Sequence, residues 1–283
     1  MIPAISIVLP TYNSFVEKQG SLDLMLRSLA NQEIAGRLEL IIVDNGSTDE
    51  TWCYLQTSIP PCLRGFTTVL QCAEVGNRSK ARNMGSSVAT GDMVIFLDDD
   101  VILLGKQALE IALCKTAPGT FACGAKRRWM VRHWDSTAIR NEIDGIGEPY
   151  IVANSFLPKG VSRESGYRDL QEYSFLGNFG IVPICYLKQY GGFNEEEFPS
   201  RREDNELMLR LLVRGVGFSN LFDCCECIHL THPMVSTAPD ERIHYHLRFR
   251  EYEQRIGFRL KANNLFGVFE GEGHDSALEV LNV

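Results

Sequence analysis

The sequence predicts an α/β fold: a single Rossmann-like, mostly parallel sheet flanked by helices. Short apolar runs rich in β-branched residues alternate with helical segments, which is typical of a parallel sheet covered on both faces. These runs end in polar or acidic residues, and no internal repeat or low-complexity linker divides the 283 residues. The chain is therefore expected to form one compact unit with a sizeable core.

The first half of the chain alternates the two kinds of segment in a regular order. Apolar, β-branched runs predict strands over residues 4–10, 38–44, 66–72 and 92–98. The spacing of apolar or small residues predicts helices over 21–32 and 79–90, and a turn at 45–50 precedes a further helix start. This alternation places the carboxyl ends of the strands at one edge of the sheet, where ligands bind in open α/β sheets.

The second half of the chain is less regular. Residues 120–130 predict a fifth strand, whereas residues 133–172 show little periodicity, which is typical of a functional or mobile segment. Helices are predicted over 203–215 and, with mixed charge, over 240–263. We expect the last helix to pack on the main domain and to offer a surface for a homodimer. Peripheral contact with a membrane is an alternative use of the same helix.

The composition argues against several functional classes. A formal net charge of −8 lacks the basic footprint of a nucleic-acid-binding protein. No apolar run reaches the length of a transmembrane segment, and the first ten residues lack the basic region and cleavage site of a signal peptide. Nine scattered cysteines, an odd number, favour free thiols and a reducing, cytoplasmic location.

Two groups of acidic residues are candidates for chemistry. Asp98, Asp99 and Asp100 follow the fourth predicted strand, and on an extended chain Asp98 and Asp100 point to one side while Asp99 points to the other. Two carboxylates on one side can hold Mg²⁺ or Mn²⁺, which favour oxygen ligands; a solvated turn is the alternative. The second group, Glu203 and Asp204, opens a predicted helix, where acids also stabilise the helix dipole without any further role.

Four segments together resemble a known family. In chain order they are "SIVLPTYN", "ELIIVDNGSTDET", "SKARNMGSSVATGDMVIFLDDD" and "YGGFNEEEFPSRREDNELMLRLLVRG". Over residues 4–230 the chain resembles family 2 of the inverting nucleotide-sugar glycosyltransferases, which have the GT-A fold. The resemblance implies a GT-A domain at 1–235 with a C-terminal helical extension at 236–283. It also implies metal-dependent transfer of a sugar from a nucleotide-sugar donor, most simply a UDP-sugar, to an acceptor hydroxyl.

The resemblance assigns roles to the residues that match the donor and metal motifs. Those implied to contact the nucleotide are Pro10, Thr11 and Tyr12 along the base and ribose, Asp44 as acceptor of a hydrogen bond from the base, and Arg82 nearby. Those implied around the sugar and metal are Asp98 close to the ribose, Asp99 in the variable middle place of the D-x-D motif, Asp100 as the direct metal ligand, and Asn178 at the sugar hydroxyls. His232 is the candidate for a late metal ligand, with His229 as the alternative; a plain structural histidine is the simpler explanation of both.

The resemblance also implies a general base in the pair that follows Gly191, Gly192 and Phe193. Asp204 is the better match and would take the proton from the acceptor hydroxyl, while Glu203 would orient the acceptor or stabilise the helix start. The two roles could be exchanged. The acceptor class stays open among small molecules, glycans, lipid-linked molecules and peptides.

Two other functions compete with glycosyl transfer. A nucleotidyltransferase would be expected to carry a Gly-rich, basic loop after the first strand, which "LPTYNSF" lacks. A non-catalytic nucleotide-sugar binding module is disfavoured because Asp98, Asp100 and Asp204 are all present.

Overall fold

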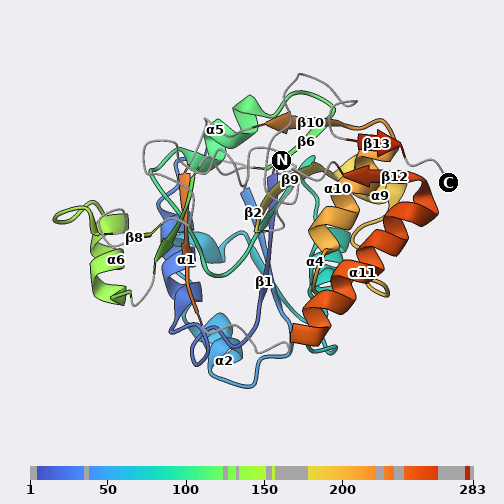
Figure 1. Cartoon of the computed structure of the whole chain (residues 1–283). Helices are drawn as coiled ribbons and strands as arrows, with labels where there is room; N and C mark the ends of the chain where they lie inside the picture. The colour runs from blue at the N-terminus through green and yellow to red at the C-terminus, as the bar shows by residue number, and fades with distance from the viewer. Residues whose placement is uncertain are drawn as a thin grey trace.

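The body of the protein is a seven-stranded sheet with helices on both faces, as Figure 1 shows for the computed structural model. The structure describes residues 5–34, 38–123, 127–131, 134–150, 155–156, 178–220, 226–232, 239–260 and 278–280. The strand order in the main sheet is β10-β6-β9-β4-β1-β2-β3. These strands are β1 (Ile5–Thr11), β2 (Leu38–Asp44), β3 (Thr67–Gln71), β4 (Met93–Leu97), β6 (Thr120–Cys123), β9 (Phe179–Pro183) and β10 (Gly217–Asn220).

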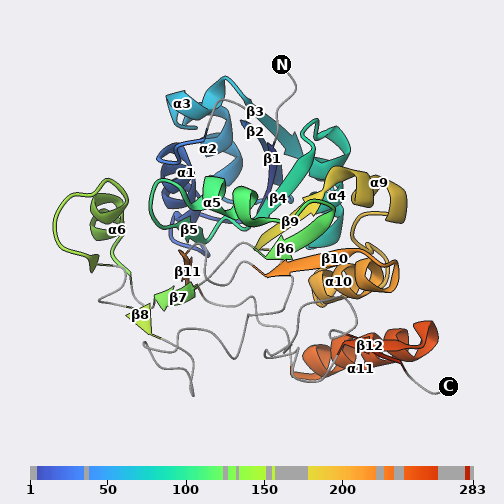
Figure 2. The same ribbon diagram turned by 90° about the horizontal axis from the view of Figure 1, so that it is seen from above.

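The helices divide between the two faces of this sheet (Figure 2). One face is covered by α1 (Ser21–Ala30), α2 (Thr51–Thr57), α3 (Pro61–Arg64) and α5 (Ala108–Lys115). The other face is covered by α4 (Arg78–Val88), α9 (Ile184–Tyr190), α10 (Glu203–Val213) and α11 (Pro239–Ile256). Each layer of helices therefore closes its own hydrophobic core against the sheet.

Alternation of side chains along the central strands supplies both cores. In β1, Ile7 and Leu9 join the core under α1, whereas Val8 joins the core under α4. In β4, Ile95 and Phe96 divide between the same two cores. Because successive side chains of a strand point to opposite faces, a continuous apolar run is buried only when both faces are covered.

Register brings the polar strand ends to one edge. β1 pairs in parallel with β2 and β4, and Thr11 lies opposite Asp44. β9 runs antiparallel between β4 and β6, so the sheet is mostly rather than wholly parallel. The arrangement is the mostly parallel, helix-flanked sheet that the sequence predicts.

A second, four-stranded sheet was not predicted. It consists of β5 (Val101–Leu103), β11 (Glu226–Leu230), β7 (Arg127–Val131) and β8 (Ser155–Phe156). The single strand expected over 120–130 was wrong, because β6 joins the main sheet and β7 joins this one. A local apolar pattern cannot show that two parts of one run pair with different, distant strands.

The segment expected to be irregular, 133–172, contains a helix, α6 (Ser136–Ile143). Asp135 caps it by accepting a hydrogen bond from the Ala138 N–H at 2.6 Å. The pattern was missed because α6 is short and buries only Ile139. Most of the remaining stretch lies outside the described residues.

The C-terminal region packs on the α10 side of the protein. The Phe198 ring lies 5.9 Å from the Phe249 ring and 5.6 Å from the Tyr252 ring, both on α11. The expected helical extension also contains an antiparallel pair of short strands, β12 (Phe258–Leu260) and β13 (Leu278–Val280). The domain boundary at 235, the homodimer surface and the cytoplasmic or membrane-peripheral location stay predictions. Within the described residues, every helix is too short or too polar to span a membrane.

Close packing of α4 on the sheet gives a first prediction. A Cβ at Gly85 would lie 2.5 Å from Val8 Cγ1 and 3.3 Å from Val43 Cγ2. We expect Gly85→Ala to lower the free energy of unfolding by about 1–3 kcal/mol, the usual cost of an overpacked core, in urea denaturation. Gly65→Ala is the matched control, because no atom lies within 4 Å of its added Cβ. Equal losses in both variants would contradict the close-packing explanation.

Candidate functional site

The loop after β1 is tied to the loop after β2 by a set of hydrogen bonds. The Asn13 N–H donates to Ser47 Oγ at 3.0 Å, and the Thr48 N–H donates to Asn13 Oδ1 at 2.8 Å. The Asp49 carboxylate accepts from the N–H groups of Phe15 and Val16 at 3.0 and 2.9 Å. The two loops therefore form one rigid wall at the carboxyl edge of the sheet.

Asp44, the last residue of β2, offers a hydrogen-bond acceptor beside this wall. Its Oδ1 accepts from the Ser47 N–H at 3.2 Å, whereas its buried Oδ2 has no hydrogen-bond partner in the described part of the chain. Pro10 and Thr11 are buried beside it, and Tyr12 is half-buried. An unpaired carboxylate oxygen in this place suits a ligand N–H, because leaving it unpaired is costly.

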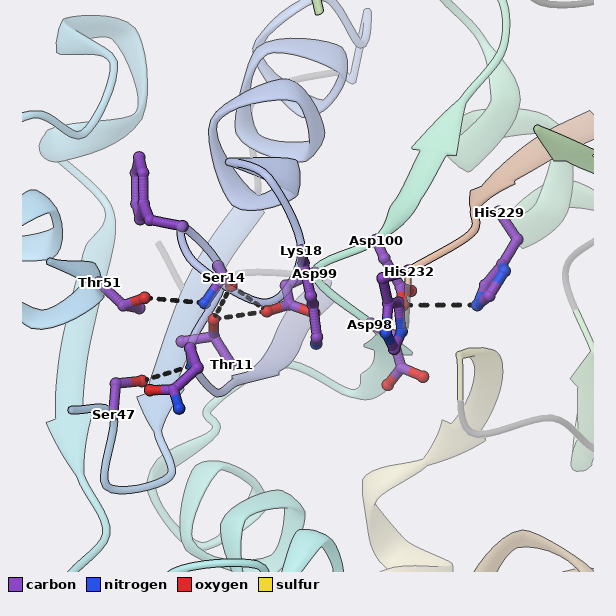
Figure 3. Close-up of polar contacts among 12 residues, drawn as sticks. Thr11, Ser14, Lys18, Ser47, Thr51, Asp98, Asp99, Asp100, His229 and His232 are labelled. Atoms are coloured by element: carbon purple, nitrogen blue, oxygen red, sulfur yellow. Dashed lines mark hydrogen bonds and ion pairs between the residues drawn. The ribbon is translucent and has the colours of Figure 1, made fainter. Parts of the chain in front are cut away.

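The three consecutive aspartates do not alternate along an extended chain. They form a turn after β4, in which the Val101 N–H donates to the Asp98 carbonyl at 3.2 Å, so the extended geometry predicted from the sequence was wrong. In Figure 3 the Asp99 side chain lies toward Thr11, Ser14 and Lys18, whereas Asp100 lies beside His232 and His229. Asp98 forms an ion pair with Arg82, and Asp99 accepts a hydrogen bond from Thr11 at the end of β1. Asp100 lies beside His229 and His232.

Asp99 lies inside the protein and is 1% exposed. Its Oδ2 accepts hydrogen bonds from Thr11 Oγ1 at 2.6 Å and from Ser14 Oγ, and its Oδ1 forms an ion pair with Lys18 Nζ. Both carboxylate oxygens are therefore engaged within the protein, as is the Thr11 hydroxyl. The donor contact predicted for Asp99 has no free oxygen to make it, and Lys18 was not singled out in the sequence.

Asp100 lies between two histidines at the junction with the second sheet (Figure 3). Its Oδ2 is 3.0 Å from His232 Nε2 and 3.4 Å from His229 Nε2. The strand pairing explains the arrangement, because β11 runs antiparallel to β5 and the Leu230 N–H donates to the Asp100 carbonyl at 2.9 Å. Together the three side chains, which we call the metal group, offer ligand atoms within 4.8 Å of one another.

The metal group fits a divalent cation. Asp100 Oδ1 and His229 Nδ1 are buried and have no hydrogen-bond partner among the described residues. Burial alone would raise the pKa of Asp100, but His229, His232 and Lys18 outweigh it and hold that pKa well below its usual range. A charged carboxylate beside two imidazoles is a donor set for a transition metal ion. Asp98, predicted as a further ligand, is not a member of this group.

Arg82 joins the aspartate turn to the second acidic pair. Its guanidinium lies 2.9 Å from Asp98 Oδ1 and 3.0 Å from Glu203 Oε1, over the Phe193 ring. Arg82 is 1% exposed and Glu203 is buried, while the Asp98 side chain is 21% exposed, so a buried cation joins one buried and one partly exposed carboxylate. The residue predicted near the nucleotide thus also holds the two halves of the site together.

The acidic pair opens α10 after a left-handed residue, Arg202, whose φ is 63°. Glu203 is buried, while Asp204 is half-buried and accepts from the Asn205 N–H at 2.8 Å. Burial and the neighbouring Glu203 charge raise the pKa of Asp204 to about 6, although Arg82 and the Asn205 N–H oppose the shift. A carboxylate that titrates near neutral pH is suited to accept a proton.

Asn83, the residue after Arg82, fixes the turn before α10. Its side chain accepts from the Phe193 N–H at 2.7 Å and donates to the Phe193 carbonyl at 2.8 Å. A Cβ at Gly192 would lie 2.1 Å from Asn83 Oδ1, so only glycine allows this approach. Asn178 lies at the same edge, and its carbonyl accepts from the Asp98 N–H at 3.4 Å.

Comparison with known proteins agrees with this geometry. Residues 6–124 match the model of the family described as Glycosyl transferase family 2. An N-acetylglucosaminyltransferase of Bradyrhizobium diazoefficiens is 27% identical over 139 residues, which cover 47% of this chain and 28% of that protein. The chain spans between 28% and 54% of the length of the curated relatives it matches first. The predicted family resemblance is thus confirmed.

Two solved structures establish the fold. TarS residues 1–349 of S. aureus in complex with UDP has a TM-score of 0.55 and 21% identity, covering 88% of this chain and 65% of that one. The mannosyltransferase PcManGT of Pyrobaculum calidifontis in complex with GDP-Man and Mn²⁺ has a TM-score of 0.58 and 17% identity, covering 90% and 64%. The predicted GT-A fold is confirmed.

The buried contacts of Arg82 predict a large loss of stability when the cation is removed. We expect Arg82→Met to lower the free energy of unfolding by about 3–5 kcal/mol, because Asp98 and Glu203 lose a shared buried cation. Arg78→Met is the control: its side chain is 48% exposed and 3.5 Å from Glu203, so we expect a loss under about 1 kcal/mol. Urea denaturation at neutral pH measures both, and similar losses would count against the bridge.

Proposed function

Since residues 6–124 match the model of the family described as Glycosyl transferase family 2, we propose that this chain is an inverting, metal-dependent glycosyltransferase. It transfers a sugar from a nucleoside-diphosphate sugar to an acceptor hydroxyl. In this proposal residues 1–235 are the catalytic domain, and the segment after them is an extension that supports α10. The Tyr252 hydroxyl of α11, which donates to Glu206 at 2.7 Å, is the contact that favours this support.

The observation that carries the proposal is the Arg82 bridge. It sets Asp98, beside the metal group, and Glu203, beside Asp204, on two sides of one buried guanidinium. A transfer reaction needs the donor and the proton acceptor held at a fixed separation, because most of its acceleration comes from positioning and electrostatics. A solvated acidic turn and an ordinary helix cap would require no such connection.

The donor site is built from the wall beside Asp44. In the proposal, Asp44 Oδ2 accepts a hydrogen bond from the base, Pro10 and Tyr12 line the base and ribose, and Asp98 lies near the ribose. UDP-N-acetylglucosamine is the first donor to test, because relatives are named N-acetylglucosaminyltransferases and TarS binds UDP. Asn178 is assigned to the sugar hydroxyls.

The metal ion is assigned to Asp100, His229 and His232. Two imidazoles and one carboxylate favour Mn²⁺ over Mg²⁺, since Mg²⁺ prefers an all-oxygen shell. PcManGT, which shares the fold, was solved with Mn²⁺. A bound ion would neutralise the diphosphate leaving group as a Lewis acid.

The protein's own contribution to the reaction is a proton acceptor. Asp204 takes the proton of the acceptor hydroxyl while the oxygen attacks the anomeric carbon from the face opposite the nucleoside diphosphate. One displacement of this kind inverts the configuration at that carbon. Glu203, held by Arg82, fixes the start of α10 and with it the position of Asp204.

The raised pKa of Asp204 predicts the pH profile. Only the deprotonated carboxylate accepts a proton, so kcat/KM should rise through pH 6 and level off above about pH 7. Asp204→Asn should lower kcat by about 10²–10⁴-fold and remove this limb, while UDP binding persists. Glu196→Gln, an exposed carboxylate before α10, serves as the control and should keep the profile. Full activity of Asp204→Asn would refute the base assignment.

The metal assignment predicts ion binding that depends on both histidines. We expect His229→Ala and His232→Ala each to weaken Mn²⁺ binding by at least about 10-fold, measured as free Mn²⁺ by paramagnetic resonance. Chelation should abolish turnover, and Mn²⁺ should restore it better than Mg²⁺. His244→Ala, an exposed histidine of α11, should leave binding unchanged. Unaltered affinity in His229→Ala would remove that residue from the metal group.

A direct test separates the proposal from its alternatives. Incubation with Mn²⁺ and a panel of nucleotide sugars should yield nucleoside diphosphate, and the product anomer should be inverted relative to the donor. Release of pyrophosphate from a nucleoside triphosphate and a sugar phosphate would instead identify a nucleotidyltransferase. Tight donor binding without turnover in the presence of a broad acceptor panel would support a binding module.

A further inference from the structure

We propose that Lys18 is a positioning residue for the metal group: it holds Asp99, and through Asp99 it fixes the turn that presents Asp100 to His229 and His232. The inference rests on the proposed function, because it concerns the same metal group. No motif in the sequence marks Lys18, which lies in the loop after β1, 81 positions before Asp99.

The contact lies mostly inside the protein. Asp99 is 1% exposed and the Lys18 side chain is 17% exposed, and the two form a direct ion pair. Thr11, the last residue of β1, and Ser14, from the same loop as Lys18, donate hydrogen bonds to the other carboxylate oxygen. The end of β1 and the loop after it therefore hold Asp99 with one cation and two hydroxyls (Figure 3).

Charge explains why the cation is needed. Asp98, Asp99 and Asp100 are consecutive, so each carboxylate repels its neighbours at short range. Arg82 compensates Asp98, and His229 and His232 lie beside Asp100, which leaves Lys18 as the cation paired with Asp99 in the described part of the chain. Burial lowers the pKa of Lys18, but the attraction of Asp99, Asp100 and Asp98 outweighs it and raises that pKa, so the amine stays charged.

Position in the turn explains how the effect reaches the metal group. Asp99 adjoins Asp100, and the Asp100 carbonyl is held from the other side by the Leu230 N–H of β11. The turn is thus fixed between the loop after β1 and the second sheet. Without Lys18 the Asp99 carboxylate would keep its hydroxyl donors but lose its counter-charge, and an uncompensated charge is costly to bury. The turn would then shift, and the position of Asp100 would shift with it.

The test is the Mn²⁺ affinity of the full chain with a double-mutant cycle. We expect Lys18→Met to weaken Mn²⁺ binding by about 10-fold, as loss of an outer-shell contact does at metal sites, and Lys18→Arg to recover most of it. Asp99→Asn should weaken binding similarly. The double variant Lys18→Met with Asp99→Asn should bind Mn²⁺ about as weakly as the worse single variant, because both changes break one contact. Lys106→Met, whose side chain is 69% exposed and pairs with Glu33, is the matched control.

The outcomes separate positioning from stability. A Lys18→Met protein that melts earlier but binds Mn²⁺ as tightly as the wild type would overturn the inference, as would additive effects in the cycle. If Lys18→Met does not fold, the neutral double variant and Lys18→Arg decide: wild-type affinity in the double variant refutes positioning. Absence of Mn²⁺ binding by the wild type would remove the metal site itself and the Lys18 role with it. Wild-type binding that Lys18 variants leave unchanged would overturn this inference alone.

Discussion

The buried guanidinium of Arg82 is the interaction on which the rest of the site depends. The partly exposed Asp98 and the buried Glu203 could not lie against the same interior point without a cation between them, since burial penalises charge and the two carboxylates repel. Arg82 reaches both carboxylates only because α4 lies close to the sheet, which Gly85 permits. The neighbouring residue Asn83 holds the backbone of Phe193 through two hydrogen bonds. One short helix, α4, thus sets the separation between Asp98 and the acidic pair.

The row of three aspartates is tolerated because the turn sends each carboxylate to a different partner. Arg82, Lys18 and the pair of histidines each face one of them. Contacts from α4, from the loop after β1 and from β11 offset the repulsion among the three adjacent charges. The geometry of the turn therefore depends on those three elements being in place. The middle aspartate, the one that a motif leaves variable, is the most deeply engaged of the three within the protein.

Local patterns predicted β1 to β4, α1, α4 and the start of α2, because strand and helix periodicity are properties of neighbouring residues, but they did not mark α3, β5 or α5. They also marked the acids at 98–100 and 203–204. What they could not show was pairing across the chain: Lys18 with Asp99, 81 positions away, Arg82 with Glu203, 121 positions away, and β11 with β5. The turn at Asp98 was misjudged for the same reason, since its geometry is imposed by partners distant in sequence. His229 was weighed only as the alternative to His232, because a strand supplies it.

The 121-residue separation of Arg82 and Glu203 has a consequence for how the protein comes into being. On the ribosome, Arg82 and Asp98 emerge early and can pair with each other, while Glu203, His229 and His232 arrive far later. Long loop closures are the slow, entropically costly steps of folding. The contacts of Arg82 with Glu203 and of Asp100 with the two histidines therefore form late, and until then the acidic turn is only partly compensated. Both halves of the site are in place only when the chain has been made and folded as far as His232.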